Sequence, residues 1–492
     1  MNCQIFFFDL LCSYFMKILF YSTNSNKFDC KTFKINSFPT CKMEFDELVN
    51  CFPEHEFFVV TQTPGMFLID LFDDGSFFKS EKVKYFVINS DESFSAEKFS
   101  ETILKINPDV AISVSFWTTP FDWLFIKDSL VADILNSNGI KTYCATNETS
   151  FISFDKNLTN QKVNELISNK KIKNLKIPKS IYVHHELFCS EKNKINVQEN
   201  VYKEYIFSEI KKLNFPVIIK DNYCTSSYGM EVVTSYNQVI SFLNSKRNNS
   251  DRIIQEYIEG INFGTEIYSK KNKNKLTHHV HSPFIFSTNK YGITSPKQSV
   301  KIGPIKNPKF KITKLKKSLQ QLACELKFCG ITQVDLILKN DEWYLLEINS
   351  RVSGMSKTYA SSMNKSLLQI LTELTQEKKL KSIFERKNQK ENLVINFKVP
   401  IQTENQMEEI SKIKNVKYVN QLHNLEAKQD REKGFCEIVL GNTKNFEQLK
   451  LIFDDFVNEN KLYVDETLLQ GAYDLFNLLK SFNLSIFFVN IK

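Results

Sequence analysis

The stretch that decides the fold is Val334-Asp335-Leu336-Ile337-Leu338-Lys339-Asn340-Asp341-Glu342-Trp343-Tyr344-Leu345-Leu346-Glu347-Ile348-Asn349-Ser350-Arg351. Residues 336–338 and 343–348 are apolar or β-prone runs, and residues 339–342 form a polar segment between them. Such a pattern is typical of two antiparallel strands joined by a short turn. The stretch therefore predicts a β-hairpin.

Three oxygen-bearing side chains lie in this hairpin: Asp335, Glu347 and Asn349. Side chains alternate between the faces of a strand, so Glu347 and Asn349 point the same way, and an antiparallel partner can bring Asp335 beside them. Two carboxylates and an amide suit Mg²⁺, which takes hard oxygen ligands together with substrate phosphates. Arg351 follows two residues later and could clamp a phosphoryl group. Taken alone, the motif is better explained as a hairpin with solvated acids on one face.

Length and composition bound the class of protein. A chain of 492 residues is long enough for roughly three domains. Hydrophobic residues make up 42% and charged residues 24%, which is ordinary for a globular protein. The net charge of +8 is mild, and no aromatic-interleaved basic stripe is present, so nucleic acid is not indicated as a partner.

Cysteine usage and hydropathy indicate the compartment. The 11 Cys are odd in number and contain no CxxC pair, which argues against a disulfide framework or a zinc site and favours a reducing cytoplasm. Residues 1–15 are apolar but too short to span a bilayer, and a strand is predicted to start at Met16. We expect residues 1–15 to be a leader or an over-called start, and we expect no membrane association.

The order of strand-like and helix-like runs divides the chain. Residues 16–145 alternate strands and helices, which predicts a parallel sheet with crossover helices. Residues 146–390 contain the hairpin and most of the polar motifs. Residues 391–492 read as a small β-α-β-β-α unit with a tail. The predicted fold class is therefore α/β, with an α+β middle part.

Further motifs precede the hairpin. Asp155-Lys156 opens a helix, and Lys220 ends a strand. A loop with Ser226, Ser227 and Gly229 follows, and it could lay backbone N–H groups and hydroxyls over phosphates. When that loop is considered alone, a plain hairpin loop is the favoured explanation, since so short a pattern often matches by chance. The next strand ends in Gln255-Glu256-Tyr257-Ile258-Glu259-Gly260, and its backbone could pair with the edge of an adenine ring.

The order of these five features over residues 146–370 resembles the ATP-grasp superfamily, in particular its carboxylate–amine (amino-acid) ligases. The flanking units resemble the Rossmann-like domain that precedes this fold and the small C-terminal domain of the amino-acid-ligase type. The resemblance implies a two-lobed ATP-binding core, ATP and one or two Mg²⁺ ions (or Mn²⁺) as cofactors, and small-molecule carboxylate and amine substrates. It is also compatible with a homodimer.

The resemblance implies a role for each matched residue. For ATP these are Lys156, Lys220, Ser226, Ser227, Gly229, Gln255, Glu256, Tyr257, Ile258, Asn262 and Glu266; for metal Asp335, Glu347 and Asn349; for substrate Arg351, Ser353 and Gly354. Lys220 and Arg351 would be the catalytic cations. Asn262 stands where family members often carry a glutamate for the ribose, and an amide binds a hydroxyl more weakly than a carboxylate does.

We expect an ADP-forming ligase that joins an acid to an amine, acting on an amino acid or small peptide. Two alternatives remain open. One is the carboxyphosphate chemistry of enzymes similar to biotin carboxylase and carbamoyl-phosphate synthase. The other is an ATP-binding protein that does not catalyse.

Overall fold

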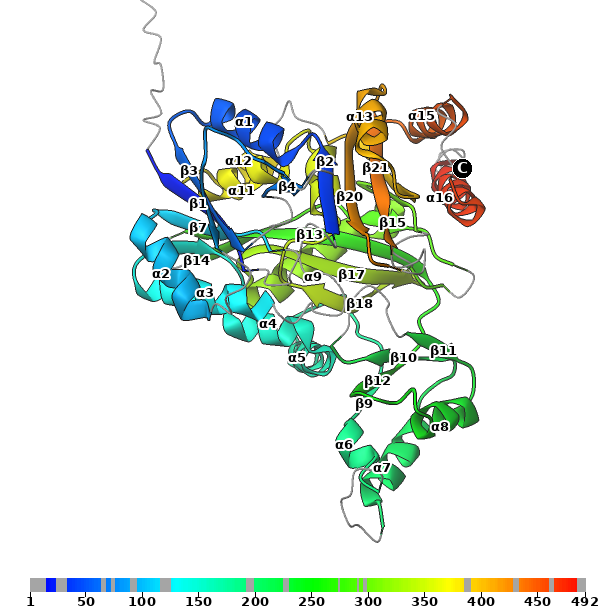
Figure 1. The fold of residues 1–492 in the computed structure, drawn as a ribbon. Coiled ribbons are helices and arrows are strands. Elements are labelled where there is room, and N and C mark those ends of the chain that lie inside the picture. Colours follow the sequence, from blue (N-terminus) through cyan, green and yellow to red (C-terminus); the bar gives the residue numbers. More distant parts are fainter. Residues whose placement is uncertain are drawn as a thin grey trace, which may run out of the picture.

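The computed structural model describes residues 15–23, 33–62, 68–71, 76–88, 95–115, 125–191, 199–223, 230–272, 275–289, 292–294, 299–384, 391–427, 433–459 and 464–484 (Figure 1). Two of our expectations fall outside these ranges. They concern residues 1–14, and the phosphate loop with Ser226, Ser227 and Gly229. Both remain predictions.

The first unit is a five-stranded parallel sheet in the order β6-β3-β1-β7-β8. Its strands are β1 (Lys17–Ser22), β3 (Glu56–Gln62), β6 (Lys84–Ile88), β7 (Val110–Ser113) and β8 (Lys141–Tyr143). Side chains of β1 alternate between two cores: Ile18 and Phe20 pack toward α1 (Cys41–Cys51), while Leu19 and Tyr21 pack toward α2 (Ala96–Ile106) and α3 (Ile126–Ser137). Helices thus cover both faces of this sheet, as the alternation of elements predicts.

A smaller lobe protrudes at the bottom of Figure 1 and is built on a four-stranded antiparallel sheet. Its order is β11 (Glu231–Val233), β10 (Val217–Asp221), β12 (Arg252–Glu256), β9 (Ser180–Val183). Three helices give it a separate core: α6 (His185–Phe188), α7 (Val201–Ile210) and α8 (Tyr236–Asn244). Val217, Ile219 and Ile254 point into this core, so Lys220 and Gln255 point to the opposite face.

The largest sheet crosses the middle of the molecule, in the order β18-β17-β13-β15-β16-β19-β21-β20-β2, with β14 paired to β13. Its strands are β2 (Phe33–Phe38), β13 (Ile261–Asn272), β14 (Lys275–Val280), β15 (Phe284–Phe286), β16 (Lys301–Gly303), β17 (Gly330–Lys339), β18 (Glu342–Asn349), β19 (Leu393–Val399), β20 (Val416–Asn424) and β21 (Gly434–Thr443). A separate two-stranded pair joins β4 (Asp70–Leu71) and β5 (Phe77–Phe78).

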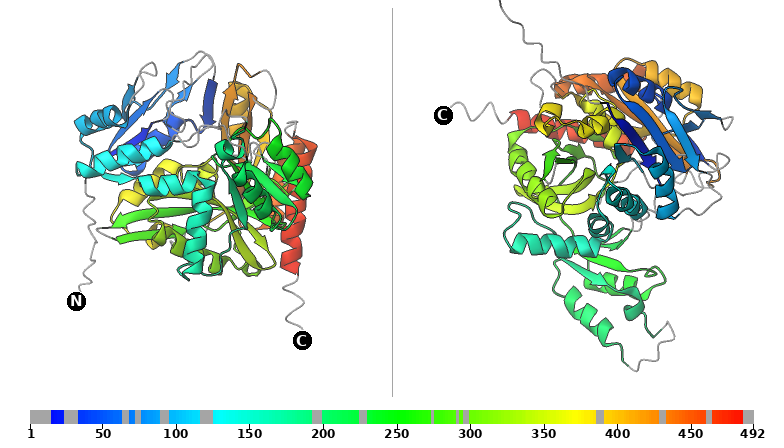
Figure 2. Two further views of the ribbon diagram at one scale, coloured as in Figure 1. Left: turned by 90° about the horizontal axis from the view of Figure 1, so that it is seen from below. Right: turned by 90° about the vertical axis from the view of Figure 1, so that its left-hand side faces the viewer.

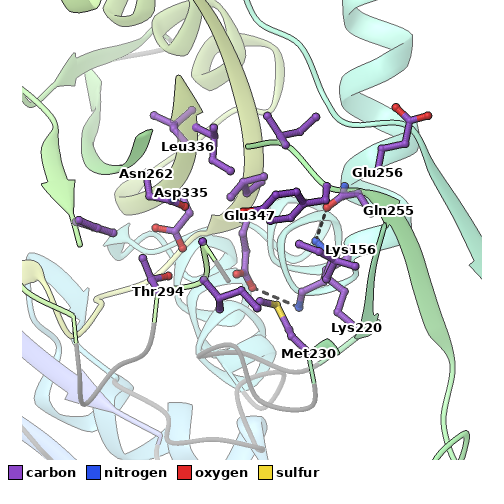
Figure 3. Close-up of a pocket in the computed structure, with 18 of the residues that line it drawn as sticks. Lys156, Lys220, Met230, Gln255, Glu256, Asn262, Thr294, Asp335, Leu336 and Glu347 are labelled. Carbon is purple, nitrogen blue, oxygen red and sulfur yellow. Dashed lines mark hydrogen bonds and ion pairs between the residues drawn. The ribbon is translucent and has the colours of Figure 1, made fainter. Parts of the chain in front are cut away.

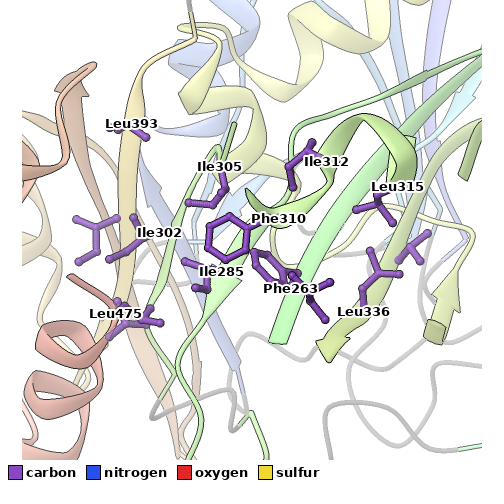
Figure 4. Close-up of a cluster of buried hydrophobic side chains, with 14 of the residues drawn as sticks. Phe263, Ile285, Ile302, Ile305, Phe310, Ile312, Leu315, Leu336, Leu393 and Leu475 are labelled. Carbon is purple, nitrogen blue, oxygen red and sulfur yellow. The ribbon is translucent and has the colours of Figure 1, made fainter. Parts of the chain in front are cut away.

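Helices cover both faces of this sheet. The remaining helices are α4 (Asn147–Phe154), α5 (Lys156–Ser168), α9 (Ile312–Glu325), α10 (Ser356–Ser362), α11 (Leu367–Thr375), α12 (Leu380–Phe384), α13 (Glu404–Lys412), α15 (Phe446–Glu459) and α16 (Glu466–Leu484). One continuous hydrophobic core lies between one face and α9, α13, α15 and α16 (Figure 4). Leu315, Leu319 and Leu322 bring the apolar stripe of α9 onto it, as their helical spacing predicts.

The predicted C-terminal unit continues this sheet instead of standing apart from it. β19 pairs with β16 of the core, and β20 pairs with β2, which comes from the first unit. The β-α-β-β-α order of residues 393–459 is present, and α16 follows it. We did not predict β2. Figure 2 shows the first unit lying beside this end of the sheet. Three sequence units therefore share one set of backbone hydrogen bonds.

Trp343 anchors the hairpin to the core. It is 2% exposed, and its ring meets Phe263 edge-on at a centroid distance of 5.1 Å. We expect Trp343→Ala to lower the free energy of unfolding by about 3–5 kcal/mol, because the change removes buried area and leaves a cavity. Chemical denaturation measures this. Leu451→Ala, at a side chain that is 60% exposed, is the control and should change stability by less than about 0.5 kcal/mol. A loss for Trp343→Ala no larger than the control would contradict the packing.

Candidate active site

The hairpin forms as predicted and sets the geometry of the site. β17 and β18 pair antiparallel with Asp335 opposite Glu347 and Gln333 opposite Asn349, and a register shift follows Asp335. The turn itself is tighter than predicted. It consists of Asn340 and Asp341, whose φ angles of 49° and 63° are the left-handed values of a two-residue hairpin turn. All four polar side chains consequently share one face of the large sheet.

The carboxylates of Asp335 and Glu347 lie close enough for their negative charges to repel each other. Burial, and after it the charge of Glu347, raises the pKa of Asp335 to about 7. Two acids held side by side resist joint ionisation unless a cation lies between or beside them. Among the described residues no cluster of three His, Cys, Asp or Glu side chains could hold a metal ion, so an ion here would use the two carboxylates and Asn349. This hard oxygen set fits Mg²⁺ with its remaining positions left to waters and phosphates.

A chain of amide contacts orients the candidate metal ligands. Asn349 Nδ2 donates to Gln333 Oε1 at 2.8 Å, and Gln333 Nε2 donates to Asp335 Oδ1 at 2.5 Å. Arg351 Nη2 lies 3.5 Å from Asn349 Oδ1, and Arg351 Nη1 donates to the carbonyl of Val352. The amide oxygen of Asn349 thus stays on the side of the guanidinium. Gln333 has no place in our sequence prediction, although it lies two residues before Asp335 on the same face.

Two lysines face these acids from other elements. Asp155 caps α5 by accepting from the backbone of Leu158, and this places Lys156 at the first position of the helix. Lys156 Nζ lies 3.3 Å from Glu347 Oε1. Lys220 Nζ donates to Gln255 Oε1 at 2.9 Å on the facing lobe. Burial, and after it the charge of Lys156, lowers the pKa of Lys220 to about 8.

A cleft between the small lobe and the large sheet collects these residues (Figure 3). It holds about 870 Å³, including space open to solvent, and its predicted members are Lys156, Lys220, Gln255, Glu256, Tyr257, Ile258, Asn262, Asp335 and Glu347. The apolar walls are formed by Ile218, Met230, Phe263, Phe286, Ile293, Leu336, Ile337 and Leu346. Gln255 Nε2 is buried and has no hydrogen-bond partner among the described residues. Since Lys220 donates to the amide oxygen, this nitrogen is an unsatisfied donor of a residue that lines the cleft.

The structure gives other surroundings to two of the predicted residues. Glu266 is fully buried beside α10, accepting from the hydroxyls of Tyr268 (2.7 Å), Ser356 (2.5 Å) and Ser353 (3.3 Å). It does not line the described cleft. Burial raises its pKa to about 7. The hydroxyl of Ser353 donates its hydrogen bond to Glu266. Gly354 is exposed at the turn before α10. Glu266 and Ser353 therefore tie the segment after Arg351 to β13.

A polar row that we did not predict extends from Asp335 across the large sheet. Lys301 on β16 is next, and burial together with the charge of Lys398 lowers its pKa to about 7. Lys398 forms a buried ion pair with Glu437. Asn396 donates to Glu437 at 2.8 Å and accepts from Lys398 at 3.0 Å. Strand alternation was the available signal, since Lys301 lies between the buried residues 300 and 302.

Part of the chain is similar in sequence to known proteins. Residues 186–370 match the family model described as D-ala D-ala ligase C-terminus. The D-alanine–D-alanine ligase of Buchnera aphidicola is 33% identical over 162 residues, which are 31% of this chain and 49% of that protein. The D-alanine–D-alanine ligase of Bacillus anthracis is 30% identical over 165 residues, which are 32% and 51%. The chain thus matches about half the length of these relatives.

Solved structures extend the similarity over the whole fold. An L-amino acid ligase from Bacillus licheniformis aligns with a TM-score of 0.59 at 16% identity, over 90% of this chain and 97% of that one. An N5-carboxyaminoimidazole ribonucleotide synthetase from Thermotoga maritima aligns with a TM-score of 0.54 at 12% identity, over 91% and 98%. The family match covers residues 186–370, and the aligned structures, at 16% and 12% identity, share the fold, so the predicted fold class is confirmed. These matches support the predicted resemblance to ATP-grasp carboxylate–amine ligases.

Lys220 predicts a pH dependence. Its pKa of about 8 means that the ammonium is present at pH 7 and is lost as the pH rises through 8. ATP affinity should therefore fall between pH 7 and pH 9 with a dependence of at most one proton. Isothermal titration calorimetry of ATP over this range measures it. Lys220→Met should abolish the step and weaken binding at pH 7, while Lys176→Met, at an exposed lysine, should leave both unchanged. A pH-independent affinity in the unaltered protein would contradict the placement.

Asp335→Asn separates binding from stability. The pKa of Asp335 is raised in the fold, so its stabilising contribution is present below its unfolded pKa and is lost as the pH rises through about 7. At pH 8 the amide should keep or raise the melting temperature while it weakens Mg²⁺ binding about tenfold or more. Calorimetry in the presence of a non-hydrolysable ATP analogue measures both. Asp341→Asn at the exposed turn is the control, and unchanged Mg²⁺ affinity in Asp335→Asn would contradict the metal assignment.

Proposed function

We propose that the protein is an ATP-dependent carboxylate–amine ligase, ADP-forming, that acts on an amino acid or a small peptide. The observation that carries this proposal is the meeting of Lys156, Lys220 and Gln255 with Asp335 and Glu347 in one cleft. Cations that face carboxylates across a cleft suit a nucleoside triphosphate and its metal ion. These residues include no Ser, Cys or His that could act as a nucleophile.

The nucleotide would lie with its base against the small lobe. The apolar walls of the cleft suit a flat ring, and Gln255 Nε2 supplies a donor for a ring nitrogen. The backbone of Glu256 and Ile258 would pair with the adenine edge, and Asn262 at the cleft wall would hydrogen-bond a ribose hydroxyl. Lys156 and Lys220 would hold phosphate oxygens, each as a point charge.

Asp335, Glu347 and Asn349 would hold one or two Mg²⁺ ions. When bound, the metal would neutralise charge on the phosphoryl oxygens during transfer. Protein groups around it have separate tasks. Gln333 keeps the Asn349 amide in position, and Lys156 balances Glu347. Arg351, next to Asn349, could hold the transferred phosphoryl group or the substrate carboxylate with two N–H donors.

The proposed reaction has two steps that balance. A substrate carboxylate oxygen attacks the γ-phosphorus of ATP, the bond to the bridging oxygen breaks, and ADP leaves. The amine then attacks the acyl carbon, phosphate leaves with the former carboxylate oxygen, and the nitrogen loses a proton. The first step turns the carboxylate into an acyl phosphate, which has a good leaving group for the second step. Positioning of the reactants and neutralisation of phosphate charge supply most of the acceleration.

We further propose a cytoplasmic location. Seven cysteines in the described residues are free thiols, which fits a reducing compartment. None of the described helices combines the length and the apolar character that a membrane span needs. A homodimer is compatible with this proposal, and light scattering on the purified protein measures it.

Amine-dependent release of phosphate from ATP tests the activity. The purified chain with Mg²⁺ is screened against pairs of amino acids and short peptides, and release should require both an acid and an amine. Bicarbonate-dependent release without an amine would favour the carboxyphosphate alternative. The arginine-specific carbamoyl phosphate synthase large chain of Bacillus subtilis is 24% identical over 185 residues, which are 37% of this chain and 17% of that protein. Tight ATP binding without release under any pair would favour the non-catalytic alternative.

Arg351→Lys tests the chemical step. A lysine keeps the charge but cannot make the two-pronged contact, so turnover should fall about tenfold or more while the apparent affinity for ATP changes little. Steady-state kinetics with the acid–amine pair found in the screen measures both. Arg247→Lys, at an exposed pair with Glu231, is the matched control. Full turnover in Arg351→Lys would place the phosphoryl clamp on another residue.

A further inference from the structure

A second cavity lies where the three sequence units meet. Figure 1 shows elements that line it, among them α1 and β20, on the side of the molecule away from the small lobe. It holds about 710 Å³, including space open to solvent. Its walls come from α1, from the segment spanning α10 and the start of α11, and from β20. The lining residues are Pro39, Glu44, Glu47, Lys357, Ser361, Asn364, Lys365, Ser366, Leu367, Gln369, Lys417 and Tyr418. None of them lines the nucleotide cleft.

Two of the lysines in this cavity are already neutralised. Lys357 pairs with Glu44 at 2.9 Å, and Lys365 pairs with Glu373 at 2.5 Å. Lys357, Glu44 and Glu373 are buried, and Lys365 is partly buried. Buried charges are tolerated when they are paired in this way. These pairs form charged but balanced walls, so they leave no net attraction for an ion.

Lys417 differs from them because its partners are neutral. Its Nζ donates to Asn364 Oδ1 at 3.1 Å and to Asn442 Oδ1 at 3.3 Å, and it forms no ion pair within the described part of the chain. Burial lowers its pKa. Two amide oxygens therefore hold a partly buried ammonium at the cavity wall without compensating its charge. A ligand carboxylate would supply the missing negative charge.

Glu47 is the complementary group on α1. Its Oε1 accepts from Gln369 Nε2 at 3.1 Å, and no described cation pairs with it. Gln369 also closes the capping box of α11, which fixes its position. Asn364 and Gln369 lie five positions apart on one segment, and they hold Lys417 and Glu47 respectively. The cavity is thus lined by a partly buried cation and by an exposed carboxylate, and neither is paired with an opposite charge among the described residues.

We propose that this cavity binds a small zwitterion of the amino-acid or short-peptide kind, with its carboxylate at Lys417 and its ammonium at Glu47. The hydroxyls of Ser361 and Ser366 and the polar lining suit such a ligand, whereas only Pro39 and Leu367 offer purely apolar contact. The site shares no lining residue with the nucleotide cleft, so its binding test does not require the proposed ligase reaction.

The cavity also touches the machinery beside the nucleotide cleft. Tyr418 lines it and hydrogen-bonds Thr358 of α10 at 2.9 Å and Glu437 of the polar row at 3.2 Å. On the same helix Ser356 donates to Glu266. A bound zwitterion would therefore contact the helix that follows Arg351.

Direct binding to the full chain without ATP tests the proposal. Glycine and glycylglycine are the zwitterionic probes; N-acetylglycine carries only the carboxylate, and ethylamine only the ammonium. In isothermal titration calorimetry at least one zwitterion should bind, and each single-charge probe should bind about tenfold more weakly or worse, since a hydrogen bond to a charged group contributes enough for that factor. The better of glycine and glycylglycine tells an amino-acid site from a peptide site.

Variants locate the binding. Lys417→Gln and Glu47→Gln should each weaken the better zwitterion about tenfold or more, Lys417→Arg should retain it, and Lys412→Gln, at an exposed lysine of α13, should leave it unchanged. Thermal melts establish that the variants fold. Binding that survives both Lys417→Gln and Glu47→Gln, binding that is lost only in Arg351→Ala, or no binding by either zwitterion would overturn the proposal.

Discussion

The opposition of Asp335 and Glu347 across β17 and β18 is the constraint on which the rest of the site depends. Two half-buried carboxylates in one register position are unfavourable in isolation, and the pKa of Asp335 is accordingly raised. The surrounding residues make the arrangement tolerable. Lys156 neutralises Glu347, and Gln333 donates to Asp335. A divalent cation would neutralise the remaining repulsion between the two carboxylates. The arrangement that costs stability without a metal is therefore the one that would bind the metal.

The two lobes supply opposite halves of the site by the same strand alternation. On β10 and β12, alternate residues fill the core of the small lobe, and the residues between them, Lys220 and Gln255, face the cleft. On β17 and β18, alternate residues fill the large core, and the acids face the cleft. A shift of one residue in any of these strands would turn its functional side chain into a hydrophobic core. Register therefore fixes both packing and chemistry.

The sequence predicted those parts of the fold that are formed by residues close together in the chain. The hairpin, the helix that starts at Lys156 and the parallel sheet of the first unit follow from alternation, capping and turn residues. β2 escaped prediction because its partner, β20, lies near the other end of the chain, and no local signal encodes that pairing. Lys301 and Glu437 escaped for the same reason, since only the assembled sheet brings them into one row with Asp335.

The fate of the carboxylate oxygens tests the central claim most directly. With the acid and amine that support turnover, an acid labelled with ¹⁸O in its carboxylate is converted in unlabelled water, and the released phosphate is analysed by mass spectrometry. An acyl phosphate formed in the cleft transfers one labelled oxygen to each phosphate. Phosphate without label, at a turnover that still consumes the acid, would contradict the account.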